Sequence, residues 1–150
     1  MFFSNSNIDT LEEFERRLCA ARRLAAAEGV EIVVDGYDHD AWRREVADGF
    51  ENEPERGRRC DRCYRYNLRR TAEYAAENGF DAFTTSLTVS PHKPSAKIFA
   101  ASGDGRFLRE DFKKKDGFRL SVKRAAELCL YRQSYCGCEF SKAHIDGARR

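Results

Sequence analysis

Hydrophobic residues in the first part of the chain change from a short cluster to a helical spacing. Residues 1–3, Met-Phe-Phe, have the apolar character of the end of a buried strand, and a polar loop follows at 4–9. Thr10 and Glu13 have the spacing of a capping box, which predicts that a helix begins here. Apolar residues then recur every three or four positions as far as Gly29, namely Leu11, Phe14, Leu18, Ala21 and Ala25.

Strand and helix patterns continue to alternate after this helix. The β-branched run 30–34 predicts a strand, and Asp40 is the expected cap of a brief helix through Trp42 and Val46. A longer helix is predicted over 60–78, where Gly79 is placed to end it. One face of this helix collects Tyr64, Leu68, Thr71 and Ala75.

The last part of the chain predicts one more strand, a loop and a helix. Residues 80–85 have the aromatic and β-branched character of a strand, and the prolines at 91 and 94 make 90–94 a loop. A final helix is expected over 121–128.

The alternation of strands and helices predicts an α/β layered domain with a mainly parallel sheet and flanking helices. No repeat, low-complexity tract or linker divides residues 1–150, so a single domain is expected. Ligands of such folds bind beyond the carboxyl ends of the strands. The loops that follow Phe3 and Thr85 are expected at that edge of the sheet.

Six cysteines change this picture once the cellular compartment is considered. The chain has no signal-peptide pattern and no apolar run of the ~20 residues that a membrane span needs, so a cytoplasmic protein without a membrane partner is expected. Structural disulfides are rare in that compartment. Metal binding or redox catalysis is therefore the better explanation of the cysteines.

Charge is unevenly distributed although the formal net charge is only +2. Acidic residues dominate 28–55, whereas arginines dominate 55–70 and basic residues dominate 106–124. Each basic segment lies close to a cysteine pair in the sequence, which indicates a polyanionic partner. The alternative is that these segments are solvated helix faces and loops.

Cys60 and Cys63 form a Cys-x-x-Cys motif at the start of the predicted 60–78 helix. Free backbone N–H groups at a helix N-terminus favour thiolates, which both metal binding and redox chemistry require. By itself the motif is compatible with a zinc half-site, an iron–sulfur half-site, a thioredoxin-like couple or chance.

Cys136 and Cys138 flank Gly137, which allows a tight backbone turn. Such a pair can close a strained, readily reduced disulfide, or it can share a metal ion. The other cysteines, Cys19 and Cys129, lie in or beside helical patterns and are expected to be small buried hydrophobic residues. The three histidines, expected in loops or at the surface rather than as ligands, are His39, His92 and His144.

Other common kinds of site have no matching pattern in the sequence. Carboxylates and histidines are not spaced for a hydrolytic metal site, and the chain has no Gly-rich phosphate loop of the Walker or Rossmann type.

Long motifs around both cysteine pairs resemble the QueH-type epoxyqueuosine reductases. The resemblance extends over nearly the whole chain, from Phe2 to Ser141. The motifs that carry it lie at residues 59–64, 68–72, 79–85, 90–93, 111–113, 117–118 and 130–141.

This resemblance implies a Rossmann-like fold and reduction of epoxyqueuosine to queuosine at the wobble position of tRNA. It also implies a [4Fe–4S] cluster whose ligands include Cys60 and Cys63, and a redox-active pair at Cys136 and Cys138. No cobalamin is implied. A second metal ion beside the cluster and the identity of the electron donor are left open by the sequence.

Basic and aromatic residues near the cysteines are the expected contacts to tRNA. Tyr131 or Tyr135 would provide a stacking surface. Phosphate contacts are expected from Arg58, Arg59, Lys113, Lys114, Arg119 and Arg132. One departure from the family pattern is Asn67, which stands where an arginine is expected.

Two alternatives share the same cysteines. A zinc-binding tRNA module without catalytic activity would use all four site cysteines as ligands. A thiol–disulfide oxidoreductase would need no metal, but it leaves the basic segments unexplained.

The resemblance also predicts that the domain is incomplete at its N-terminus. The family has an earlier strand that ends in adjacent cysteines, whereas here the chain begins at the following strand, Met-Phe-Phe. Cys60 and Cys63 provide only two of the usual four cluster ligands. We therefore expect further ligands upstream of Met1.

Overall fold

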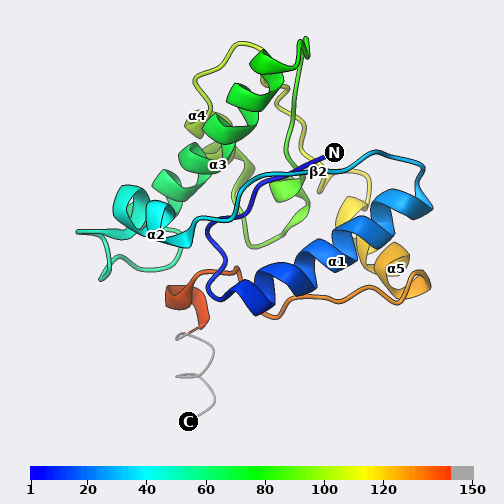
Figure 1. The fold of residues 1–150 in the computed structure, drawn as a ribbon, viewed down its shortest axis with the longest axis horizontal. Coiled ribbons are helices and arrows are strands. Elements are labelled where there is room, and N and C mark those ends of the chain that lie inside the picture. The colour runs from blue at the N-terminus through cyan, green and yellow to red at the C-terminus, as the bar shows by residue number, and fades with distance from the viewer. Residues whose placement is uncertain (143–150) are drawn as a thin grey trace.

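The computed structural model describes residues 1–142, so the expectation for His144 lies outside the described residues. Helices surround a small sheet (Figure 1). None of the described helices combines the length and apolar character that crossing a bilayer requires. The elements are β1 Phe2–Phe3, α1 Leu11–Ala27, β2 Val33–Val34, α2 His39–Trp42, the π-helical turn η1 Arg43–Ala47, α3 Arg58–Glu77, the 3-10 turn η2 Ser86–Val89, α4 Ser95–Ala101 and α5 Gly117–Glu127.

The sheet is parallel, as expected, but within residues 1–142 it has only two strands. Phe2 pairs with Val33 and Phe3 with Val34, and α1 forms the connection between the strands. The prediction of a strand over 80–85 is wrong, because Phe83 makes only an isolated parallel bridge to Phe107. Thr85, the last residue of the predicted strand, caps η2 instead. The fold is mixed helix and sheet, and a full Rossmann layered sheet is not confirmed.

Helix α1 confirms the predicted start and amphipathic pattern. The Thr10 side chain accepts a hydrogen bond from the Glu13 backbone N–H at 3.2 Å, which satisfies one of the free donors of the first turn. The Glu13 carboxylate is used elsewhere, in an ion pair with Arg17 at 2.7 Å. Phe14 and Leu18 pack under the sheet together with Ile8.

The cap of α2 is Asp38, two residues before the expected Asp40. The Asp38 carboxylate accepts from the Ala41 backbone N–H at 2.8 Å, whereas Asp40 lies inside the first turn. The chain then continues as the π-helical turn η1, which places Trp42 and Val46 in the core.

Helix α3 confirms the predicted long helix and lies between two hydrophobic clusters. Tyr66 faces the cluster formed with Trp42, Val46 and Ala47. Tyr64 and Leu68 face the cluster of Ile98 and Phe107. Ile98 belongs to α4, a helix that the sequence pattern did not predict. Packing on both sides fixes α3 and the cysteines at its beginning.

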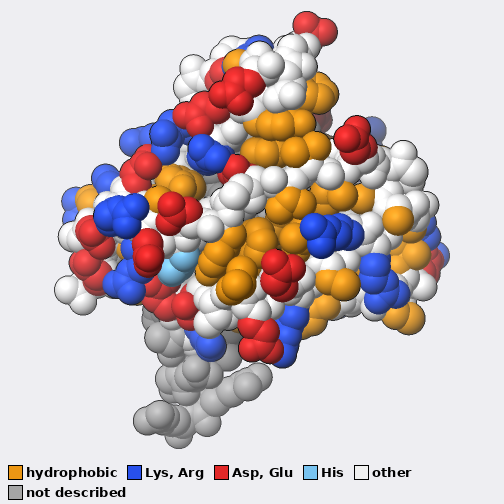
Figure 2. Space-filling model, viewed as in Figure 1, with side chains coloured by type: hydrophobic (Ala, Val, Ile, Leu, Met, Phe, Trp, Pro, Cys, Tyr) orange, Lys and Arg blue, Asp and Glu red, His pale blue; other side chains and the backbone are white. Residues whose placement is uncertain are grey.

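The surface in Figure 2 carries a hydrophobic band across the face that shows β2 and α1, with acidic and basic side chains intermingled around it. Helix α5 lies at the periphery and buries none of its residues fully. Both Cys19 and Cys129 are exposed, so the prediction that they are buried is wrong. Cys19 lies outside the buried face of α1, and Cys129 follows the peripheral helix α5.

Candidate functional site

Cys60 and Cys63 lie in the first two turns of α3, as predicted. Their spacing of three residues places them on neighbouring positions of one helix face. Cys63 packs against the cluster around Trp42, and Cys60 packs against the cluster around Tyr64. The pair therefore sits where the two hydrophobic clusters meet on α3.

The second pair converges on the same place from the segment that follows α5. Cys138 packs against the Trp42 cluster, as Cys63 does. Cys136 and Cys138 also lie close enough to influence the titration of Cys60 and Cys63. The tertiary structure thus joins two pairs that are more than 70 residues apart in the sequence. All four are free thiols, which is the reduced form of the Cys136 and Cys138 pair.

Burial controls the protonation of three of these thiols. It raises the pKa of Cys63 to about 12, with a further increase from the nearby Cys136. Burial also raises the pKa values of Cys60 and Cys138. The backbone N–H of Arg56 donates to Cys60 Sγ at 3.2 Å and works in the opposite direction. The expected stabilisation of thiolates by the helix N-terminus is outweighed here by desolvation.

Lys93 supplies a cation at the second pair. Its Nζ lies 3.0 Å from Cys136 Sγ and 5.5 Å from the centre of the Tyr64 ring. Lys93 comes from the 90–94 loop, which the sequence placed correctly but whose lysine was not predicted as a site residue. The signal in the sequence was its place in the 90–93 motif, one of those that carry the family resemblance.

The loop that carries Cys136 and Cys138 is held by its backbone. Arg17 Nη1 donates to the Cys136 carbonyl at 2.9 Å, and the Asp9 backbone N–H donates to the Gly137 carbonyl at 2.8 Å. Gly137 has a φ of 138°, and a Cβ there would lie 3.0 Å from Asn7 Nδ2 and 3.1 Å from Arg17 Nη1. The tight turn expected of Gly137 is therefore confirmed, and only glycine fits it without strain.

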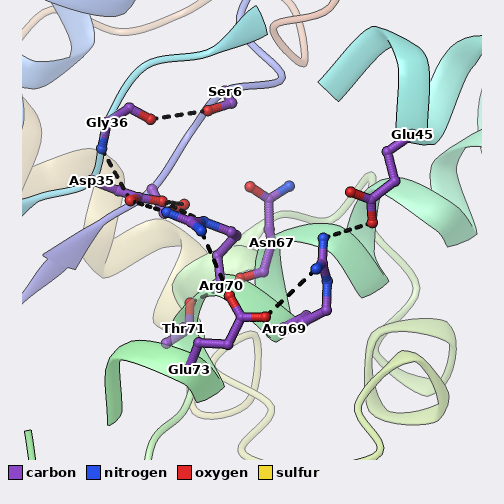
Figure 3. Close-up of polar contacts among 10 residues, drawn as sticks. Ser6, Asp35, Gly36, Glu45, Asn67, Arg69, Arg70, Thr71 and Glu73 are labelled. Carbon is purple, nitrogen blue, oxygen red and sulfur yellow. Dashed lines mark hydrogen bonds and ion pairs between the residues drawn. The ribbon is translucent and has the colours of Figure 1, made fainter. Parts of the chain in front are cut away.

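A polar network connects the strand ends to α3 (Figure 3). Asp35, which follows β2, accepts hydrogen bonds from Ser4 at 2.7 Å and from Arg70 of α3 at 2.5 Å and 3.0 Å. Burial raises the pKa of Asp35, but these hydrogen bonds lower it by more, so the net shift is downward. Asn67 Nδ2 donates to the Cys63 carbonyl at 2.9 Å and lies 3.5 Å from Cys63 Sγ. The residue that departs from the family pattern thus contacts a site cysteine.

Two of the cations expected to contact tRNA donate their hydrogen bonds to groups of the protein itself. Arg59 is only 4% exposed, and its Nη1 donates to the carbonyls of Phe50, Glu51 and Glu53. Lys113 Nζ donates to the Thr88 and Lys93 carbonyls and to Ser95 Oγ. These two cations anchor loops of the site.

The other expected phosphate contacts are exposed side chains, namely Arg58, Lys114, Arg119 and Arg132. Arg58 pairs with Glu53 at 2.7 Å, and Arg119 pairs with Asp116 at 2.9 Å. The two tyrosines expected to stack on bases have internal contacts: Tyr131 Oη donates to Glu13, and Arg17 lies over the Tyr135 ring.

Cys60 and Cys63, three residues apart on α3, are the residues that could hold a metal ion or cluster. Within residues 1–142, no group of three or more His, Cys, Asp or Glu is arranged to hold a metal ion. The buried Trp42 Nε1 finds no hydrogen-bond partner in the described part of the chain, and it lies where it lowers the pKa of Cys63. Thiol ligands beside a free N–H donor suit one side of an iron–sulfur cluster. His39 is not at the surface as expected, since its Nδ1 lies 2.9 Å from the Ser6 carbonyl and its ring stacks on Trp42.

Comparisons with known proteins agree with the motifs around these cysteines. The sequence model of the family described as Epoxyqueuosine reductase QueH matches residues 1–144. Proteins named Epoxyqueuosine reductase QueH are 37% identical in Streptococcus pyogenes serotype M1 and 32% identical in Thermotoga maritima. The alignments cover 94% and 93% of this chain, but 60% and 77% of those relatives. A relative with the same name in Acinetobacter baylyi is 35% identical over 94% of this chain and 67% of its own length. The chain belongs to the epoxyqueuosine reductase QueH family.

Proposed function

We propose that this chain reduces epoxyqueuosine to queuosine at the wobble position of tRNA. The observation that carries the proposal is the convergence of Cys60, Cys63, Cys136 and Cys138 beside the Lys93 ammonium, in a member of this family. Removal of an epoxide oxygen takes two electrons, which a dithiol can supply, and it is assisted by a Lewis acid at the departing oxygen, which a metal held by sulfur ligands would provide.

Oxidation of the Cys136 and Cys138 dithiol balances the reaction. The two thiols lose two electrons and two protons and form a disulfide. The epoxide loses its oxygen as water and becomes the alkene of queuosine. An external electron donor must reduce the disulfide before the next turnover. The free thiols of the present structure correspond to the form that is ready to react.

We also propose that Cys60 and Cys63 contribute ligands to a [4Fe–4S] cluster. A cluster bound there would supply Lewis-acid and electron-transfer chemistry at the departing oxygen. The residues of this chain contribute two thiols held at fixed spacing on α3, and packing against the clusters of Trp42 and Tyr64 shields them partly from water. Iron and sulfide analysis of the anaerobically purified protein tests this assignment, and a colourless protein with bound zinc would contradict it.

The exposed cations Arg58, Lys114, Arg119 and Arg132 are the proposed contacts to tRNA phosphates. Arg59 and Lys113 support their loops from inside. Charge reversal at Lys114 should lower tRNA affinity and reduce its dependence on salt, because each phosphate contact releases counterions. Unchanged affinity and salt dependence in the Lys114→Glu and Arg58→Glu variants would remove the basis of this assignment.

Nucleoside mass spectrometry of tRNA tests the reaction itself. Cells that lack the gene should accumulate epoxyqueuosine in place of queuosine, and the wild-type gene should restore queuosine. Cys136→Ser should fail to restore it, whereas Cys19→Ser is a matched control that should succeed, because Cys19 is exposed on α1. Normal queuosine in the deletion strain would contradict the proposal.

A further inference from the structure

The contact between Lys93 and Cys136 makes the two sulfurs of the second pair unequal. Lys93 Nζ is 3.0 Å from Cys136 Sγ, within the range of a charge-assisted hydrogen bond to sulfur. Cys138 Sγ instead lies 3.7 Å from Ser141 Oγ, to which it donates. One sulfur thus faces a cation and the other a neutral hydroxyl.

The backbone from which the Lys93 side chain extends is held by hydrogen bonds. The Lys93 backbone N–H donates to the Ser90 carbonyl at 3.2 Å, and the Lys93 carbonyl accepts from Lys113 Nζ at 3.2 Å. Lys113 Nζ is in turn held by Ser95 Oγ at 2.6 Å. Pro94 follows directly and leads into α4. The loop therefore presents the ammonium to Cys136 as part of an ordered network.

A partly buried ammonium needs a negative partner. Leaving it unpaired away from water would be unfavourable, and the Tyr64 ring at 5.5 Å compensates only in part. Burial lowers the pKa of Lys93, but Cys136 and Tyr64 raise it by more, so the net shift is upward. The ammonium form is retained, and its Nζ lies 3.0 Å from Cys136 Sγ.

The surroundings of Cys138 are apolar, and its sulfur contacts a neutral hydroxyl rather than a cation. Cys138 packs against the Trp42 cluster, and burial raises its pKa. A thiol in this setting keeps its proton and reacts slowly with electrophiles. We propose that Lys93 selects Cys136 as the sulfur that reacts first, and that Cys138 is the resolving thiol that completes the disulfide.

This inference rests on the proposed function only for the identity of the substrate. The order of the two sulfurs is a property of the protein and can be measured without RNA. Failure of the tRNA assay and failure of this inference are therefore distinguishable.

Limited alkylation of the anaerobically purified protein tests the order of reaction. Iodoacetamide is added in small amounts, and peptide mass spectrometry gives separate initial rates for Cys136 and Cys138. We expect Cys136 to react at least about tenfold faster than Cys138, because an ammonium lies at the Cys136 sulfur whereas the Cys138 sulfur faces a neutral hydroxyl. Equal rates, or faster alkylation of Cys138, would overturn the inference.

Variants at Lys93 show whether the lysine is the cause. Lys93→Met should reduce the ratio of the two rates to within about twofold, whereas Lys93→Arg keeps the cation and should preserve most of the preference. Lys97→Met is the matched control, since Lys97 pairs with Asp61 at 3.0 Å and should leave the ratio unchanged. An unchanged ratio in Lys93→Met would show that another group selects Cys136. If circular dichroism shows that Lys93→Met is unfolded, Lys93→Gln replaces it with the same expected ratio.

Discussion

The two cysteine pairs reach one site from structurally different regions. Cys60 and Cys63 belong to α3, a 20-residue helix with hydrophobic clusters on both sides. Cys136 and Cys138 belong to an irregular segment that is held by hydrogen bonds from Arg17 and Asp9 and by the contact to Lys93. Packing fixes the first pair, and polar contacts position the second.

This difference matches the different tasks proposed for the pairs. Ligands of a cluster must keep a constant spacing, which a packed helix provides. A redox pair must bring two sulfurs together and separate them again, which a short loop around Gly137 allows. The difference also implies that substitutions in the two regions have separable effects, and the following predictions test that separation.

The largest expected effect is on bound iron. Cys60→Ser and Cys63→Ser should lose the cluster, because a hydroxyl is a far poorer iron ligand than a thiolate. Cys136→Ser and Cys138→Ser should keep most of the iron but abolish turnover. Iron and sulfide per chain are measured beside activity. Loss of all iron from Cys136→Ser would indicate that Cys136 is a cluster ligand, and the two pairs would then not have separate tasks.

A smaller but substantial effect, on stability, is expected at Arg17, which clamps the loop of the second pair through its hydrogen bond to the Cys136 carbonyl. Arg17 and Glu13 form an ion pair whose side chains are only 10% and 8% exposed, and Arg17→Met leaves Glu13 without this partner. We expect a loss of roughly 3 kcal/mol in the free energy of unfolding, measured by urea denaturation. Arg16→Met is the control, since its exposed pair with Glu12 contributes about 0.5 kcal/mol. Equal effects of the two substitutions would show that Arg17 is not a clamp.

Gly137→Ala should act on the loop and leave the helix pair intact. The added methyl group would contact Asn7 and Arg17 at a φ of 138°, so we expect destabilisation of about 1 to 3 kcal/mol. Activity should fall while the iron content stays at the wild-type level. Gly29→Ala provides a comparison, because its φ of 64° is also positive but no atom lies within 4 Å of the new Cβ. An effect on activity as large in Gly29→Ala would indicate a general loss of stability.

The smallest loss of stability is expected at the strand ends, where Asp35 connects β2 to α3. The pKa of Asp35 is lowered in the folded protein, so its ion pair with Arg70 stabilises the fold above the ordinary pKa of 3.8 and loses this contribution as pH falls through the folded value. Asp35→Asn should cost about 1 kcal/mol at pH 7, since Arg70 is 40% exposed. Thermal unfolding across pH measures the difference from wild type, which should vanish in acid. A difference independent of pH would mean that packing, not charge, is lost.

Local patterns in the sequence predicted the helices with the strongest periodicity. The α1 start at Thr10 and the α3 end at Gly79 follow from short-range backbone chemistry, which neighbouring residues alone determine. The prediction of a strand over 80–85 failed because strand formation depends on a distant partner. In the described part of the chain only Phe83 finds one, at Phe107. Helix α4 was missed because seven residues carry too little periodicity to stand out.

The sequence by itself determined the family, through long motifs around Cys60, Cys63, Cys136 and Cys138. It also indicated that these cysteines carry the chemistry. Only the tertiary structure decided which cations are available to a partner, because Arg59 and Lys113 are used internally while Arg58 and Lys114 are exposed. It also decided that Lys93 faces Cys136 and that Cys19 and Cys129 are outside. Contacts between distant segments and the burial of a charge depend on how all elements pack, and no local pattern of residues records that.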